Sequence, residues 1–233
     1  MKEKKFNFKN KWFHPNVEKV LPELLADVRQ APDILEIGCW EGYSSCKWIE
    51  HLKPANFYAV DGWRDQEAVS RFDHNTSLAK EKARCQTSIK KIKGPSQEAL
   101  RKIENINFDF IYIDGSHTAF HILSDLINAI HLLKTGGIIA IDDYKWNLSE
   151  SRSENFKGRH SLCIPYPGIK SFLDIFSPFV EVVYEGYQIW IKKKRNHLCS
   201  PEDNDPRNLI DWCGNIKNPK EWEKIPQSVW ANK

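Results

Sequence analysis

Strands and helices alternate along this chain from residue 33 onward, and that alternation limits the possible folds more than any other feature. Short apolar runs are each followed by a longer segment with helical spacing of its apolar residues. The predicted strands are 34–37, 56–61, 89–93, 108–114 and 138–141, and the predicted helices are 42–52, 66–83, 97–103 and 119–133. Such a sequence predicts an α/β domain whose mostly parallel sheet is covered by helices on both faces.

The flanking segments extend this domain at both ends. Apolar residues from Val17 to Val28 recur at helical spacing, and Pro22 inside the pattern predicts a helix start or a kink there. A further helix is expected over 169–176. Two apolar runs joined by Glu185 and Gly186 then predict an antiparallel hairpin at the end of the sheet, with strands at 180–184 and 187–191. We therefore expect three parts: a basic segment and helix (1–32), the α/β domain (33–195) and an irregular tail (196–233).

Composition excludes several classes of protein. The 233 residues are 41% hydrophobic and 28% charged, as is usual for a globular protein in water. No apolar run reaches the roughly 20 residues that a membrane-spanning helix needs. The charged N-terminus leads into no apolar signal core, and the six cysteines form no CxxC pair, so we expect a cytoplasmic protein with reduced thiols. A net charge of +3 is too small to predict nucleic-acid binding, and the oligomeric state, including a homo-oligomer, is left open.

Acidic residues follow two neighbouring predicted strands at the point where each strand ends. Asp114 closes the run 108–114, His117 follows three residues later, and Asp142 and Asp143 close the run 138–141. Carboxylates gathered at one edge of a sheet can hold a hard cation, and a histidine beside them can accept a proton. Aspartates at strand ends also cap helices and turns, and His117 could cap the helix that follows it.

A glycine-containing turn joins the first predicted strand to the first helix. Its sequence runs from Glu36 through Gly38 and Gly42 to Ser45. Glycines allow a ligand to approach the backbone closely, and the N-terminus of the next helix favours negative groups. Asp61 ends the second strand, where an acidic residue commonly binds ribose hydroxyls. The GxGxxG pattern of dinucleotide-binding folds is absent, since Cys39 and Trp40 follow Gly38.

The pattern Glu-x-Gly-x-x-x-Gly-Tyr-Ser resembles motif I of class I S-adenosylmethionine-dependent methyltransferases, especially the metal-dependent O-methyltransferases that act on catechols or macrolide sugars. The resemblance covers about residues 33–192 and implies a doubly wound, Rossmann-like sheet of seven strands with a terminal antiparallel hairpin. It also implies that the segment 94–97 flanks the adenine of the cofactor. The cofactor-binding residues that it implies are Glu36, Gly38, Gly42, Ser44, Asp61, Gly62, Ser96 and Asp114.

The same resemblance assigns roles to the acidic strand ends. Asp114, Asp142 and Asp143 would hold Mg²⁺ or a similar divalent cation, which orients and acidifies a hydroxyl of a small-molecule acceptor, plausibly a sugar. Asp114 could instead contact the methionyl amino group. His117 would be the general base, because a histidine titrates near neutral pH. His121, one turn later, is expected to be structural.

Three alternatives fit the same motifs. Some cephalosporin-hydroxylase-like proteins resemble this fold, a non-catalytic protein could keep the cofactor pocket, and an RNA methyltransferase would bind RNA in a salt-sensitive way. The basic residues of 80–102 and 192–195 could attract an acidic substrate or simply be solvated. The polar segment 145–162 has the length of a lid next to the strand ends. We therefore predict an O-methyltransferase whose acceptor the sequence does not name.

Overall fold

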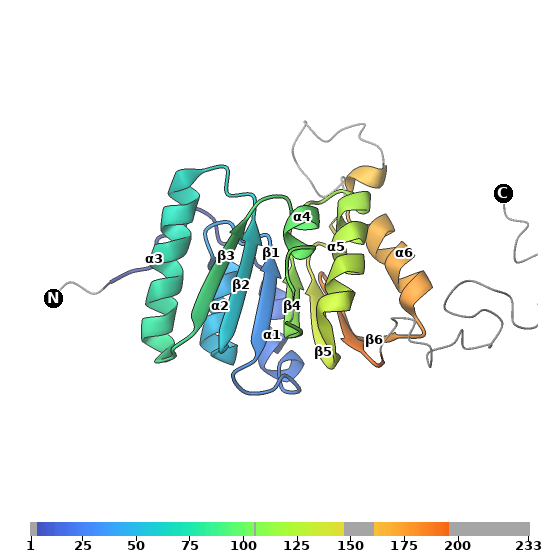
Figure 1. The fold of residues 1–233 in the computed structure, drawn as a ribbon, viewed down its shortest axis with the longest axis horizontal. Coiled ribbons are helices and arrows are strands. Elements are labelled where there is room, and N and C mark those ends of the chain that lie inside the picture. The colour runs from blue at the N-terminus through green and yellow to red at the C-terminus, as the bar shows by residue number, and fades with distance from the viewer. Residues whose placement is uncertain (1–3, 105, 147–160, 196–233) are drawn as a thin grey trace, which may run out of the picture. The chain divides into compact units, whose positions relative to one another are not determined.

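The computed structural model describes residues 4–104, 106–146 and 161–195. One mixed sheet of seven strands forms its centre, in the order β3-β2-β1-β4-β5-β7-β6 (Figure 1). Strands β1 to β5 pair in parallel, and β7 pairs antiparallel with both β5 and β6. The strands are β1 (Asp33–Ile37), β2 (Asn56–Asp61), β3 (Ser88–Lys93), β4 (Phe108–Ile113), β5 (Leu133–Ile141), β6 (Val180–Glu185) and β7 (Ile189–Lys193). The predicted doubly wound sheet with a terminal antiparallel hairpin is thereby confirmed.

Helices cover both faces of the sheet and divide the interior into two apolar cores. One core contains side chains of α1 (Pro15–Leu24), α2 (Tyr43–Leu52) and α3 (Gln66–Ala83). The other contains side chains of α4 (Ser96–Leu100), α5 (Ala119–Leu132) and α6 (Tyr166–Phe176). A short 3₁₀ turn, η2 (Ser161–Cys163), precedes α6. Strand β4 supplies both cores, because successive side chains of a strand point to opposite faces.

Central burial explains why β4 is apolar on both faces. Ile111 and Ile113 belong to the core under α5, whereas Phe110 and Tyr112 belong to the core under α2. All four side chains are fully buried. A strand with parallel partners on both sides and helices on both faces has no solvent side, so it needs no polar alternation.

Several element boundaries differ from the prediction. Helix α1 ends at Leu24 and contains Pro22, whereas the apolar pattern predicted a helix that extends to Val28. Helix α6 begins at Tyr166, before the predicted 169, because Pro167 in its first turn suits helical φ and needs no donor there. Strand β5 begins at Leu133 instead of 138 and passes through an irregularity in its pairing with β4. The predicted tail 196–233 and most of the predicted lid lie outside the described residues.

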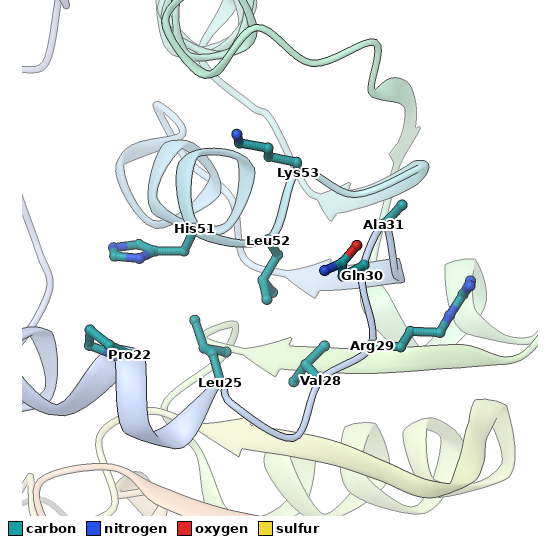
Figure 2. A pocket seen from close by; sticks show the side chains of 9 residues that line it. All are labelled: Pro22, Leu25, Val28, Arg29, Gln30, Ala31, His51, Leu52 and Lys53. Atoms are coloured by element: carbon teal, nitrogen blue, oxygen red, sulfur yellow. The ribbon is translucent and has the colours of Figure 1, made fainter.

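A cavity of about 640 Å³ lies near the beginning of β1, away from the strand ends that carry the acids. It separates the end of α2 from the connection that follows α1. Figure 2 shows Leu25, Val28 and Leu52 pointing toward its middle, while Arg29 points away. Arg29 instead pairs with Asp109, at 2.8 Å between Nε and Oδ2.

Candidate active site

The carboxyl ends of the parallel strands meet at one edge of the sheet, and the chain leaves each strand there with a further backbone hydrogen bond. The amide of Gly38 donates to the carbonyl of Val60 at 2.9 Å, and the amide of Asp114 donates to the carbonyl of Ile37 at 2.8 Å. The amide of Asp142 likewise donates to the carbonyl of Ile113, at 2.9 Å. These bonds fix the positions at which the predicted site residues leave the sheet.

Gly38 is required by a close backbone contact. Its φ is +86°, and a Cβ at this position would lie 1.8 Å from the carbonyl oxygen of Asp114. Any side chain there would push the first strand-to-helix turn away from the end of β4. The glycine that the sequence pattern singled out therefore joins the predicted cofactor turn to the predicted acidic cluster.

A cavity of about 670 Å³ opens at this edge. Its walls come from the turns after β1, β2, β3 and β4, which is where a parallel sheet of this type binds its ligands. Predicted site residues in the wall are Gly38, Asp61, Gly62, Ser96, Asp114 and His117. A smaller cavity of about 30 Å³ adjoins it, and Ser44 belongs to its wall.

Glu36 lies beneath the turn instead of in either cavity wall. Its side chain is fully buried and accepts hydrogen bonds from the hydroxyls of Ser44, at 2.5 Å, and of Ser45. Burial raises the pKa of the Glu36 carboxyl to about 7, although the two hydroxyls oppose this rise. Glu36 therefore supports the turn from inside.

Gly42 also has a packing role. It is the residue before α2, with φ +81°, and a Cβ there would come within 3.0 Å of the Phe72 ring. Helix α3 can approach the turn closely because this position has no side chain.

Asp61 both lines the large cavity and holds the turn in place. One carboxylate oxygen accepts hydrogen bonds from the backbone amides of Cys39 and Trp40, each at 2.9 Å. The other accepts one from the amide of Trp63 at 2.6 Å. The Trp63 side chain is buried and packs on Phe72, so it does not form part of the cavity wall.

The two acids after β5 point in different directions. Asp142 is only 8% exposed, and it accepts hydrogen bonds from the Tyr112 hydroxyl and from the amide of Asp143. Burial, followed by repulsion from Asp143, raises the pKa of Asp142 to about 6. Gln188 donates to the Tyr112 hydroxyl at 3.3 Å and extends this buried chain of hydrogen bonds. Asp142 thus faces the interior.

Asp143 faces the other way and meets His117. Its φ is +56°, an uncommon conformation for a residue with a side chain. One carboxylate oxygen lies 2.9 Å from Nε2 of His117, and the other accepts a hydrogen bond from the Tyr187 hydroxyl at 2.7 Å. The hydrogen bond to Asp143 raises the pKa of His117. Asp114 completes the group, because one potential ligand atom from each of these three residues lies within 4.8 Å of the others.

The sequence missed the tyrosines that orient these acids. Tyr112 has the signature of an ordinary core residue in β4, and Tyr187 lies in the connection before β7, more than 40 positions after Asp143. The pairing of β4 with β5 brings Tyr112 to Asp142, and the pairing of β5 with β7 brings Tyr187 to Asp143. Nδ1 of His121 lies 2.8 Å from the hydroxyls of both Ser116 and Thr118, and His121 also belongs to the wall of the large cavity.

Known proteins resemble this chain in sequence and in fold. A family model described as a methyltransferase domain matches residues 35–144. The O-methyltransferase ankF of Aspergillus thermomutatus is 36% identical over 121 residues, which are 51% of this chain and 48% of that protein. Over these residues the chain is similar to class I S-adenosylmethionine-dependent methyltransferases. The aligned part spans about half the length of this curated relative.

Two solved structures illustrate the shared fold of this methyltransferase domain. TomG, an O-methyltransferase from Streptomyces achromogenes solved with S-adenosylmethionine, has a TM-score of 0.58 and 17% identity, over 80% of this chain and 83% of that one. MycE, from mycinamycin biosynthesis and solved with Mg, S-adenosylhomocysteine and mycinamycin VI, has a TM-score of 0.56 and 21% identity, over 82% of this chain and 51% of that one. Among the described residues, no helix is long and apolar enough to span a membrane.

Proposed function

We propose that this protein transfers a methyl group from S-adenosylmethionine to a hydroxyl of a small molecule, with a divalent cation at the acidic cluster. The convergence of Asp114, His117 and Asp143 beside the large cavity carries this proposal. A cofactor cavity and a cluster of proton-accepting and cation-binding groups share one edge of the sheet. That arrangement suits the activation of a hydroxyl next to a bound methyl donor.

The cofactor would occupy the cavities beside the first turn. Asp61 would receive the ribose, and Gly38 would let the cofactor approach the backbone of the turn. Gly62 and Ser96 would form the adenosine side of the wall. Glu36 would act indirectly, by holding the Ser44 hydroxyl in the smaller cavity. When bound, S-adenosylmethionine supplies the methyl group.

The donor groups fit a divalent cation, although the set differs from the one that the sequence predicted. Asp114 and Asp143 each bring a carboxylate oxygen into the same group of potential ligand atoms as His117, within 4.8 Å, whereas Asp142 lies outside that group and is turned toward the buried Tyr112 hydroxyl. Removal from water, with repulsion from Asp142 and Asp143, raises the pKa of Asp114 well above its usual range. Such crowded negative charge favours a cation such as Mg²⁺ or Mn²⁺, which would orient and acidify the acceptor hydroxyl. We therefore assign Asp142 a supporting role.

His117 is the group best placed to remove the proton from the acceptor. Its side chain is 51% exposed at the cavity wall, so an acceptor can reach it, and Asp143 fixes the orientation of its ring. A carboxylate in this position stabilises the imidazolium that forms when the ring accepts a proton. His117 could instead serve as a third cation ligand, and experiment can separate the two roles.

Calorimetry with S-adenosylhomocysteine tests the cofactor assignment, and no binding at millimolar ligand would rule it out. Products from a panel of phenols and sugars can be analysed by mass. A gain of one methyl supports the proposal, and a gain of one oxygen would favour cephalosporin-hydroxylase-like chemistry. Salt-sensitive binding and methylation of RNA, with no product from the small molecules, would favour the RNA-modifying alternative.

The roles of the acids and the histidine can be tested by titration with Mn²⁺. We expect Asp143→Asn to weaken Mn²⁺ binding at least about tenfold, and the matched variant Asp142→Asn to weaken it less. His117→Ala should leave Mn²⁺ affinity nearly unchanged and lower turnover about 10²-fold or more. Loss of Mn²⁺ affinity in His117→Ala would make the histidine a ligand. Full turnover after removal of all divalent cations would contradict the cation's role.

A further inference from the structure

An aromatic side chain from the N-terminal segment forms part of the cofactor site. Trp12 is 64% exposed and belongs to the walls of both the larger and the smaller cavity. Its ring stacks on that of Trp40, with centroids 6.3 Å apart and planes inclined by 27°. An exposed tryptophan that lines a cavity, and whose stacking partner lies in the predicted cofactor turn, needs an explanation other than core packing.

The segment that carries Trp12 is held against the domain by a buried polar network. We call residues 6–14 the N-terminal strap. Glu41, in the glycine turn, accepts a hydrogen bond from the amide of Lys9 at 2.6 Å and forms an ion pair with Arg71 at 2.7 Å. Asn75 of α3 accepts from the amide of Asn7 at 2.7 Å. Glu41 and Asn75 are fully buried, so the strap is fixed to the turn and not merely adjacent to it.

The far end of the strap is also fixed. Phe13 packs edge-on against Trp48 of α2, and the ring of His14 stacks on that of Tyr187 at 4.3 Å. Tyr187 in turn orients Asp143. Trp12 is therefore positioned between two anchored ends of the strap.

The position of Trp12 coincides with the junction of the two cavities. The walls of both cavities include Trp12, Gly38, Trp40 and Asp114. On the proposed function, the adenosine of the cofactor lies in the larger cavity and its methionine part lies toward Ser44. The sulfur that joins these two parts would then lie at the junction.

We propose that Trp12 recognises the positive charge of the methyl donor. The sulfur of S-adenosylmethionine is a sulfonium cation, and the face of an indole ring attracts a cation. The sulfur of the product, S-adenosylhomocysteine, is neutral and gains only van der Waals contact. Trp12 would therefore favour the donor over the spent product. This inference rests on the proposed function, because it requires this cofactor in these cavities.

The test is the affinity of both cofactor forms for Trp12→Ala and Trp12→Phe, measured by calorimetry. We expect Trp12→Ala to weaken S-adenosylmethionine about tenfold and S-adenosylhomocysteine about threefold or less, since a ring–cation contact adds to simple burial. Trp12→Phe, which keeps an aromatic face, should recover most of the preference for the donor. The exposed apolar residue Ile175 of α6 gives the control Ile175→Ala, which should change neither affinity.

The outcomes separate this inference from the proposed function. If the wild-type protein binds neither cofactor form, the proposed function fails. If it binds both and Trp12→Ala weakens both equally, or weakens neither, the recognition of charge by Trp12 is refuted while the function stands. Because Trp12 is mostly exposed, thermal unfolding of the variants should match that of the wild type.

Discussion

Glu36→Gln tests whether the buried Glu36 carboxyl, which supports the glycine turn, is costly to ionise in the folded protein. In the folded protein the pKa of Glu36 is raised from 4.5 to about 7 by burial. The folded state therefore keeps its proton at pH values at which the unfolded state has lost it. Stability from this group is fully present below about pH 4.5 and is lost as the pH rises through about 7, because the unfolded state then binds fewer protons.

The size of the effect follows from the same two pKa values. At about 1.4 kcal/mol for each unit of pKa, the full difference corresponds to about 3 kcal/mol. Most of it, about 2.5 kcal/mol, falls between pH 5 and pH 8 by the same linkage relation. Glutamine has the same shape and no titrating proton, so the variant lacks this pH dependence. The stability of Glu36→Gln relative to wild type should thus rise by that amount over this range.

Urea unfolding at several pH values between 5 and 8, followed by circular dichroism, measures this difference directly. Other titrating groups are common to both proteins and cancel in the comparison. Glu50→Gln is the matched control, since Glu50 is an exposed glutamate on α2, the helix that carries Ser44 and Ser45, and its replacement makes the same change away from the buried carboxyl. A Glu36→Gln difference that stays constant to within about 0.5 kcal/mol across the range would refute the reasoning from burial.

Two further variants test how the fold positions the site. Gly38→Ala should lose S-adenosylhomocysteine binding and about 2–4 kcal/mol of stability, because its Cβ would collide with the Asp114 backbone. The control Gly62→Ala places its Cβ in open space and should keep its stability in the same unfolding assay. Lys193→Met should lower the free energy of unfolding by about 1–3 kcal/mol, since the buried ammonium donates to two carbonyls at the end of α5. The control Lys192→Met loses only a surface ion pair and should lower it by under about 1 kcal/mol. Equal losses in the two variants would contradict this account.

The sequence predicted the strands and helices well where periodicity and burial agree. The strands β1 to β4 lie within one or two residues of their predicted bounds. The first residues of β5 were missed because Gly136 and Gly137 resemble a turn, although the structure accommodates them in a strand. Gly137 faces the carbonyl of Asp109 so closely that a Cβ would lie 3.0 Å from it. A tertiary contact of this kind leaves no signal in local spacing.

The candidate site was predictable by position and not by direction. The ends of parallel strands meet at one edge, so Asp61, Asp114 and the acids after β5 could be grouped from the sequence. Their orientations depend on partners far along the chain. Tyr112 draws Asp142 inward, whereas Tyr187 and a left-handed backbone at Asp143 direct that residue toward His117. Sequence spacing treats these adjacent aspartates alike, and only the packed fold distinguishes them.

The hydrogen bonds of Asp61 have a consequence for how a nucleoside can enter. A carboxylate offers about four acceptor positions, and three backbone amides already use those of Asp61. A ribose diol would bring two more donors, which exceeds the remaining acceptor capacity. On the proposed function, a ribose that donated both hydroxyls to Asp61 would therefore share or displace an amide of the glycine turn. Entry of the proposed cofactor would then weaken hydrogen bonds that hold the backbone of its own binding site.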